Sequence, residues 1–196
     1  RSMIAEYIEC LHNERWYEPP VDFGELARSL RVGAHHESAL RFKANVLTST
    51  FKPTQYLSAD TFQAFALDFL VLGNGFLEKR ESRGKSLLNL KHSLGKYTRR
   101  GLNLDQYYFV QDYGTVHEFP KGKVYHLREP DLHQEVYGLP QYLGAMQSAF
   151  LNEAATLFRR RYYANGSHAG FILYLTDPAQ DQEDIDAMRE QLVKSK

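Results

Sequence analysis

Apolar residues recur at three- and four-residue spacing in the first part of the chain, and this period predicts amphipathic helices. The predicted helices are Met3 to Tyr17, Phe23 to Leu30, His36 to Leu47 and a stretch that Ser58-Ala59-Asp60 precedes and that contains Phe62, Phe65, Ala66, Phe69 and Leu70. Pro19-Pro20 ends the first of them, and Gly73-Asn74-Gly75 ends the last.

After Gly75 the period changes to the alternation of strands. Tyr113-Gly114 supplies a turn between two of the alternating stretches, which predicts a hairpin there. The predicted strands are Phe76 to Arg80, Leu87 to Leu94, Tyr107 to Val110, Val116 to Phe119 and Val124 to Leu127.

The segment from Val136 to Gly166 has the most fully specified shape in the chain. Gly138 permits a tight turn, Pro140 suits the first turn of a helix, and Asn165-Gly166 ends the helix. The helix has an apolar stripe made of Leu143, Met146, Phe150, Ala154, Leu157 and Phe158. Its second face carries the small residues Ala145, Ser148, Asn152 and Ala155. Because small residues let another helix approach closely, this face is a candidate subunit contact.

Beyond Gly166, Phe171 to Leu175 reads as a strand and Asp181 to Lys196 as an amphipathic helix. The order is helices, a strand-rich insert, and then a long helix, a strand and a helix. This order predicts an α+β fold rather than a regular βαβ alternation. We divide the chain accordingly into residues 1–72, 73–135 and 136–196.

The composition is that of an ordinary globular protein, with 196 residues, 43% hydrophobic residues and no formal net charge. The longest apolar run, Phe65 to Leu72, is interrupted by Asp68, so no membrane segment is predicted. Cys10 is the single cysteine, which excludes an internal disulfide and a multi-cysteine zinc site. No signal peptide opens the chain, and the default expectation is synthesis in the cytoplasm.

Opposite charges are segregated along the chain. Between Lys79 and Arg100 lie eight basic residues and the single acid Glu81, whereas Asp177 to Glu190 holds six acids and one arginine. Such blocks are solvated faces, or they make electrostatic contact with nucleic acid or between copies of the chain. The candidate basic residues that face DNA or a partner are Arg99, Arg100, Arg159, Arg160 and Arg161. The last three also suit the negative end of a helix dipole.

Recognisable catalytic chemistry is missing from the sequence. Gly84-Lys85-Ser86 resembles the tail of a phosphate-binding loop, but the glycine required five residues earlier is replaced by Lys79. His35-His36-Glu37 are neighbours that would not converge on one metal from a helix, and His126 and His133 lack a third ligand. We therefore predict a non-enzymatic protein without cofactor or metal.

Five motifs in order resemble those of bacteriophage portal proteins, in particular the portal vertex proteins of temperate contractile-tailed coliphages. They are Leu72-Gly73-Asn74-Gly75-Phe76-Leu77-Glu78, Val124-Tyr125-His126-Leu127-Arg128, Val136-Tyr137-Gly138-Leu139-Pro140, Arg161-Tyr162-Tyr163-Ala164-Asn165-Gly166 and Phe171-Ile172-Leu173. Their order and spacing agree with the family from about residue 60 to the end.

The resemblance implies a subunit of a dodecameric ring at one capsid vertex, which surrounds the DNA channel and docks the terminase large subunit, neck and capsid proteins. It implies a wing role for residues 1–72, a clip or wing role for residues 73–135, and a stem-like role for the helix of residues 136–196. It also implies a fragment that lacks the crown-side part, a location in the virion, and assembly in the host cytoplasm. The alternative reading is a nucleic-acid-binding module that uses the basic segment of residues 79–100.

Overall fold

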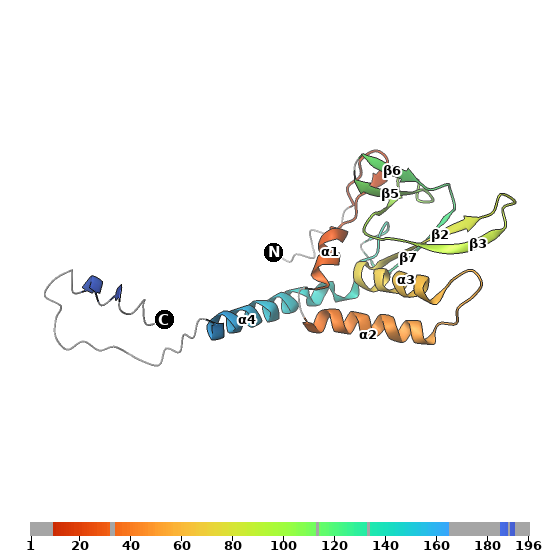
Figure 1. Cartoon of the computed structure of the whole chain (residues 1–196). Helices are drawn as coiled ribbons and strands as arrows, with labels where there is room; N and C mark the ends of the chain where they lie inside the picture. The colour runs from red at the N-terminus through yellow and green to blue at the C-terminus, as the bar shows by residue number, and fades with distance from the viewer. Residues whose placement is uncertain are drawn as a thin grey trace. The chain divides into compact units, whose positions relative to one another are not determined.

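The computed structural model describes residues 10–31, 34–112, 114–132, 134–164, 185–187 and 189–190. Contacts within the chain divide it into two units, residues 1–150 and residues 151–196. The first unit contains the helices α1 to α3 and the strands β1 to β7 (Figure 1). This combination of helices and antiparallel sheets confirms the predicted α+β class.

Three helices of the first unit lie where the apolar spacing predicts them. They are α1 (Phe23–Ser29), α2 (Ala34–Thr50) and α3 (Ala59–Leu72). The Ser58 hydroxyl accepts a hydrogen bond from the Thr61 N–H at the start of α3, and Gly73 ends the helix in the left-handed conformation with φ of 69°. Both ends of α3 are therefore set by single residues of its own sequence.

Replacement of Ser58 with alanine should destabilise the protein by about 1 kcal/mol, because the substitution leaves the Thr61 N–H without its cap. Urea unfolding followed by circular dichroism measures the change. Ser49→Ala, at an exposed position near the end of α2, is the matched control. Equal effects of the two substitutions would contradict the capping role.

The strands form two antiparallel sheets. One has the order β1-β4-β5-β6, and the other has the order β3-β2-β7. The bounds in the first sheet are β1 (Trp16–Tyr17), β4 (Thr98–Gly101), β5 (Tyr107–Asp112) and β6 (Thr115–Glu118). Those in the second are β2 (Asn74–Glu81), β3 (Leu87–Ser93) and β7 (Val124–Arg128). Helices α2 and α3 pack side by side, and α3 covers a face of the second sheet (Figure 1).

The core joins both sheets to the helices. Phe76 on β2 and Tyr107 on β5 bring the two sheets together, with ring centroids 6.1 Å apart. Phe23 of α1 packs edge-on against Tyr137 at a centroid distance of 5.6 Å. Tyr137, Phe76 and Phe23 are each at most 1% exposed. The segment that contains Tyr137 is therefore part of the core rather than a surface connection.

The prediction of a helix from Met3 to Tyr17 is wrong over its described part, residues 10–17. His12 forms a bridge with Tyr17, and Trp16 pairs with Gly101 of β4. Trp16 is 4% exposed and packs against the ring of Tyr108. A long-range contact thus overrides the local helical spacing.

Strand β4 is not among the predicted strands. Its buried positions are Thr98 and Gly101, which are polar or small, so the stretch lacks the alternation of apolar residues that identifies a strand.

The long helix starts differently from the prediction. Residues Gln141–Ala145 form a 3-10 helix that Pro140 precedes, and the α-helix α4 runs over Met146–Ala164. The predicted strand Phe171 to Leu175 lies outside the described residues, as does most of the predicted helix Asp181 to Lys196. None of the helices in the described ranges is long and apolar enough to cross a membrane.

Candidate assembly interface

A buried amide, that of Asn74, fixes the approach to helix α4. The side-chain N–H groups of Asn74 donate to the carbonyl oxygens of Leu72 and Gly138, both at 2.8 Å. Its side-chain oxygen accepts from the Gly138 N–H at 2.8 Å and from His126 Nε2 at 2.9 Å. The side-chain nitrogen of Asn74 thus faces two carbonyl oxygens, and its side-chain oxygen faces two N–H groups. Only one orientation of the amide satisfies all four contacts. We call this group of contacts the Asn74 junction.

Two glycines allow the chain segments of the Asn74 junction to come together. A Cβ on Gly138 would lie 2.3 Å from the Gly73 carbonyl oxygen and 2.4 Å from the Glu129 nitrogen. A Cβ on Gly73 would lie 2.6 Å from the Leu139 carbonyl carbon. The Glu129 N–H donates to the Gly73 carbonyl at 2.8 Å. Three of the motifs quoted for the portal resemblance therefore meet at one point in space.

His126 is a structural member of this junction. Its ring stacks on Phe76 with centroids 4.3 Å apart, and its Nε2 carries the proton that the Asn74 oxygen accepts. Burial lowers the pKa of His126 to about 3, and the positive charges of Arg100 and Arg128 act in the same direction. His126 is therefore neutral in the folded protein at physiological pH.

Acid should destabilise the protein through His126. The unfolded chain protonates this histidine near pH 6.5, whereas the folded state resists protonation down to about pH 3. The unfolded state therefore binds more protons in this window, and stability present above pH 6.5 is lost as the pH falls. At pH 5 the loss should be about 2 kcal/mol. His126→Gln should flatten the dependence of urea unfolding on pH between 6.5 and 5, while substitution of the exposed His117 should leave the slope unchanged.

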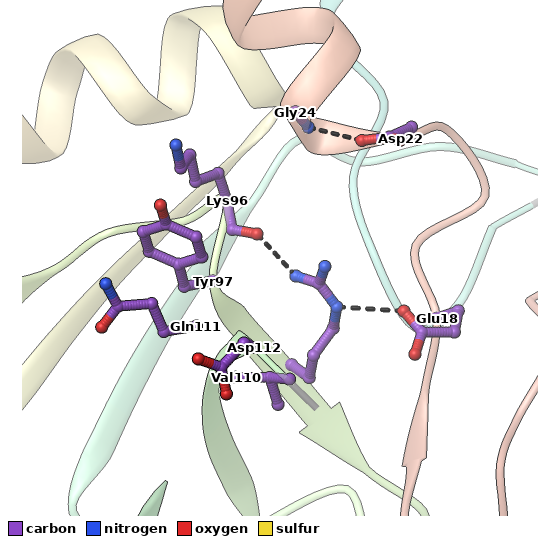
Figure 2. Close-up of a pocket in the computed structure, with 9 residues that line it drawn as sticks. Glu18, Asp22, Gly24, Lys96, Tyr97, Val110, Gln111 and Asp112 are labelled. Atoms are coloured by element: carbon purple, nitrogen blue, oxygen red, sulfur yellow. Dashed lines mark hydrogen bonds and ion pairs between the residues drawn. The ribbon is translucent and has the colours of Figure 1, made fainter. Parts of the chain in front are cut away.

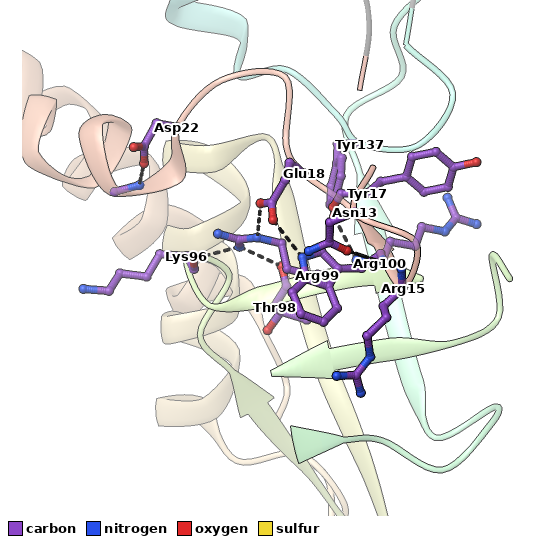
Figure 3. A network of polar contacts seen from close by, with 12 residues as sticks. Asn13, Arg15, Tyr17, Glu18, Asp22, Lys96, Thr98, Arg99, Arg100 and Tyr137 are labelled. Carbon is purple, nitrogen blue, oxygen red and sulfur yellow. Dashed lines mark hydrogen bonds and ion pairs between the residues drawn. The ribbon is translucent and has the colours of Figure 1, made fainter. Parts of the chain in front are cut away.

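Tyr137 connects the same segment to the first sheet. Its hydroxyl donates to the Tyr17 carbonyl at 2.6 Å and accepts from the Arg100 N–H at 2.8 Å (Figure 3). Burial raises the pKa of this hydroxyl far above its usual range, so it stays protonated and able to donate. Tyr137 thus ties β1 and β4 to the residues that lead into α4.

The two arginines of β4 make contacts inside the unit. The Arg99 side chain is 16% exposed. Its Nε donates to the Glu18 carboxylate at 3.1 Å, and its Nη1 donates to the Lys96 carbonyl at 2.9 Å (Figure 3). Arg100 donates to the Val136 carbonyl at 3.1 Å. The assignment of Arg99 and Arg100 to a surface that faces DNA or a partner stays a prediction. The structure places their donors in internal contacts.

An open hollow of about 240 Å³ lies beside Arg99 (Figure 2). Its charged lining consists of Glu18, Asp22, Lys96, Arg99 and Asp112. The Asp22 carboxylate already accepts from the Gly24 N–H at 2.6 Å, and Glu18 accepts from Arg99. Three of its charged side chains, those of Glu18, Asp22 and Arg99, therefore already have partners, and the hollow does not resemble an apolar ligand pocket.

The remaining candidate chemistry of the sequence has structural explanations. Gly84-Lys85-Ser86 lies in the turn between β2 and β3, so no helix follows it as a phosphate-binding loop requires. Burial raises the pKa of Cys10 to about 11, and its thiol donates to Gln134 at 3.3 Å. Within the described ranges, no three His, Cys, Asp or Glu side chains come together as a metal site. His133 lies outside those ranges.

Helix α4 exposes most of its apolar stripe. Met146 is 8% exposed, whereas Phe150, Leu157 and Phe158 are 43%, 44% and 70% exposed. The predicted small-residue face is divided between two elements, since Ala145 ends the 3-10 helix and Ser148, Asn152 and Ala155 lie on α4. The first three of these small residues are exposed and Ala155 is half-buried. The basic residues Arg159, Arg160 and Arg161 are exposed near the end of the helix.

This arrangement favours contact with another macromolecule over catalysis. Large apolar side chains in continuous exposure are typical of surfaces that a partner covers. The Asn74 junction holds the residues before α4 in one conformation. Asn74 and Tyr137 stand within the quoted motifs, but nothing in the sequence pattern marks their side chains as the contacts that fix the residues before the helix.

No protein-family profile matches the chain. Over all 196 residues the chain is 54% identical to the probable portal protein of Escherichia phage P2, of which it covers 57%. It is 33% identical over 206 aligned residues to the probable portal protein of Haemophilus phage HP1 (strain HP1c1), of which it covers 59%. The chain thus spans somewhat more than half of the length of these relatives.

Solved structures share the fold at low sequence identity. A chain from the neck of an empty GTA particle matches with a TM-score of 0.64 and 15% identity, over 86% of this chain and 55% of the other. A chain from the virion of a native gene transfer agent (GTA) particle matches with a TM-score of 0.63 and 16% identity, over 88% and 54%. A chain from the neck of a native GTA particle, computed with C12 symmetry, gives a TM-score of 0.61.

Proposed function

Because the chain is similar along its whole length to the probable portal proteins of phages P2 and HP1, we propose that it is part of a portal ring subunit. Such a ring occupies one vertex of the capsid and forms the channel for DNA packaging and ejection. The observation that carries the proposal is 54% identity over all 196 residues. At that identity the two proteins are expected to share the fold over these residues.

The proposed role is structural rather than enzymatic. The subunit would act through surfaces that bind other copies, the terminase large subunit, neck and capsid proteins, and DNA in the channel. Residues 1–72 are proposed to lie in the wing, residues 73–135 in the clip or wing, and α4 in a stem-like position. The protein would be assembled in the host cytoplasm and retained in the virion.

Helix α4 is the surface that best supports assembly into a ring. A ring requires a heterologous interface, in which one face of a subunit meets a different face of the next. The exposed stripe of Phe150, Leu157 and Phe158 offers apolar area for such a contact. Ser148 and Asn152 on the same helix are small enough for another helix to approach.

Electron microscopy of the full-length protein tests the proposal. We expect closed rings, with twelve subunits as in the C12 symmetry of the similar neck structure. Phe158→Glu should reduce ring formation, because a charge would be placed at a contact from which water is excluded. The control is Leu132→Glu, at another exposed apolar position, after β7. A protein that remains monomeric at high concentration in light scattering would refute the ring.

A further inference from the structure

The topology of the second sheet brings two basic turns to the same end. Strand β2 ends at Glu81 and β3 begins at Leu87. The hairpin turn between them, residues 82–86, therefore lies at one end of the sheet (Figure 1). The Lys79 N–H donates to the Lys123 carbonyl at 2.6 Å, so the turn before β7 lies beside it. We call the cations gathered here the basic sheet end. They are Lys79, Arg80, Arg83, Lys85, Lys121 and Lys123.

Two carboxylates at this end balance only part of the positive charge. Glu78 pairs with Arg80 at 3.2 Å. Glu81 accepts from Lys79 at 3.0 Å and also from Lys123, and hydrogen bonds from these two ammonium groups lower its pKa. Six cations against two carboxylates leave a net charge of +4. Arg83, Lys85 and Lys121 are exposed.

The hairpin turn is held in one shape by its own hydrogen bonds. The Ser82 N–H donates to the Ser86 carbonyl at 2.9 Å, and the hydroxyls of these two serines lie 2.6 Å apart. The Lys85 N–H donates to the Ser82 carbonyl at 2.9 Å, and Lys85 has a φ of 62°. A fixed turn presents its cations with less loss of entropy on binding than a flexible loop would.

The complementary charge is present in the same sequence. Asp177 to Glu190 contains six acids and one arginine, a net charge of −5. Of this acidic stretch the structure describes residues 185–187 and 189–190, where Asp186 and Arg189 lie 3.9 Å apart with exposed side chains. Even with that pair formed, the stretch keeps its net negative charge.

We propose that the basic sheet end of one copy binds the acidic stretch of a neighbouring copy. The charges are opposite and of similar size, and every copy carries both surfaces. In a ring each subunit contributes one surface to the neighbour on one side and the other surface to the neighbour on the other side. The inference rests on the proposed ring. It adds to the apolar contact on α4 a second contact between copies, which is electrostatic and therefore sensitive to salt.

Zero-length crosslinking tests the contact directly. A carbodiimide joins a lysine to a carboxylate only when the two are in contact. In rings assembled from equal amounts of unlabelled and ¹⁵N-labelled full-length protein, we expect mixed light–heavy peptides that join Lys85 or Lys121 to the acidic stretch. These peptides should disappear at high salt. Crosslinks confined to single copies, or the absence of crosslinks from the basic sheet end, would overturn the proposal.

Charge reversal separates contact between copies from contact within one copy. Variant one carries Arg83→Glu, Lys85→Glu and Lys121→Glu; variant two carries Asp181→Lys, Asp184→Lys and Asp186→Lys. Each alone should associate on the order of tenfold more weakly than the native protein. Equal mixing should restore assembly, because each variant then meets a complementary neighbour. Contact within one copy would instead be restored only when all six substitutions share one chain.

Lys43→Glu with Lys52→Glu is the control, at exposed positions on α2 and just after it. Rings that form equally well from all variants would overturn the salt-sensitive contact while leaving the proposed ring intact. Failure of the native protein to form rings would instead refute the proposed function. Binding of duplex DNA that is lost in variant one, without crosslinks between copies, would assign the basic sheet end to phosphate and overturn the proposal.

Discussion

Replacement of Gly138 with alanine is expected to destabilise the protein by about 3 kcal/mol or more. The added Cβ would lie 2.3 Å from the Gly73 carbonyl oxygen and 2.4 Å from the Glu129 nitrogen. Both are backbone atoms, so a change of side-chain rotamer cannot relieve the clash. The backbone must move, and the hydrogen bonds of the Asn74 junction would lengthen with it.

Two other glycines supply matched controls for this experiment. Gly144 has no atom within 4 Å of an added Cβ, so Gly144→Ala should change the free energy of unfolding by less than about 0.5 kcal/mol. Gly122 also has open space but a φ of 73°, and Gly122→Ala should cost about 1 kcal/mol from the backbone alone. Urea unfolding curves of the three variants measure these differences. A Gly138→Ala variant as stable as Gly144→Ala would contradict the close approach.

Asn74→Ala is expected to cost about 3 to 5 kcal/mol. The substitution leaves the Gly138 N–H, two carbonyl oxygens and His126 without their partner in a site where Asn74 itself is 0% exposed. Each unsatisfied buried group costs about 1 to 3 kcal/mol, and relaxation recovers part of the sum. Asn89→Ala, at an exposed position on β3, should have little effect.

Asn74→Asp distinguishes hydrogen bonding from packing at the same site. The aspartate keeps the shape of the side chain but directs a carboxylate oxygen at the carbonyls of Leu72 and Gly138. Repulsion and burial would raise the pKa of this carboxyl in the folded state, so that the folded state binds a proton more readily than the unfolded chain. The stability difference from the native protein should therefore shrink as the pH falls from 7 to 5. A difference that does not depend on pH would argue that packing dominates.

Helix α3 could be predicted with both ends because its determinants are local. Ser58 caps it, Phe65 and its apolar neighbours give the period, and Gly73 ends it. Strand β4 could not be predicted, since its buried positions Thr98 and Gly101 are not apolar and its neighbour β1 is distant in sequence. The expected helix before Tyr17 fails for the same reason, because Trp16 pairs with Gly101.

The portal resemblance, read from the motifs, is confirmed by the relatives from phages P2 and HP1. The contacts that join these motifs in the folded chain could not be read from the sequence. Asn74, His126 and Gly138 are separated by 52 and 12 residues, and only the folded chain brings them together. The subunit contact through Ala145, Ser148, Asn152 and Ala155 stays a prediction, as does the basic surface of Arg159 to Arg161.

The Asn74 junction also bears on the order of events in folding. Its bonds join residues that are 64 positions apart, and strands β2 to β7 lie within the enclosed loop. Closing such a loop carries an entropic cost that must be met before its contacts stabilise the chain. We expect the junction to form after the transition state. Asn74→Ala should therefore accelerate unfolding while leaving the refolding rate nearly unchanged, so that this amide determines how long the native fold persists rather than how fast it is reached.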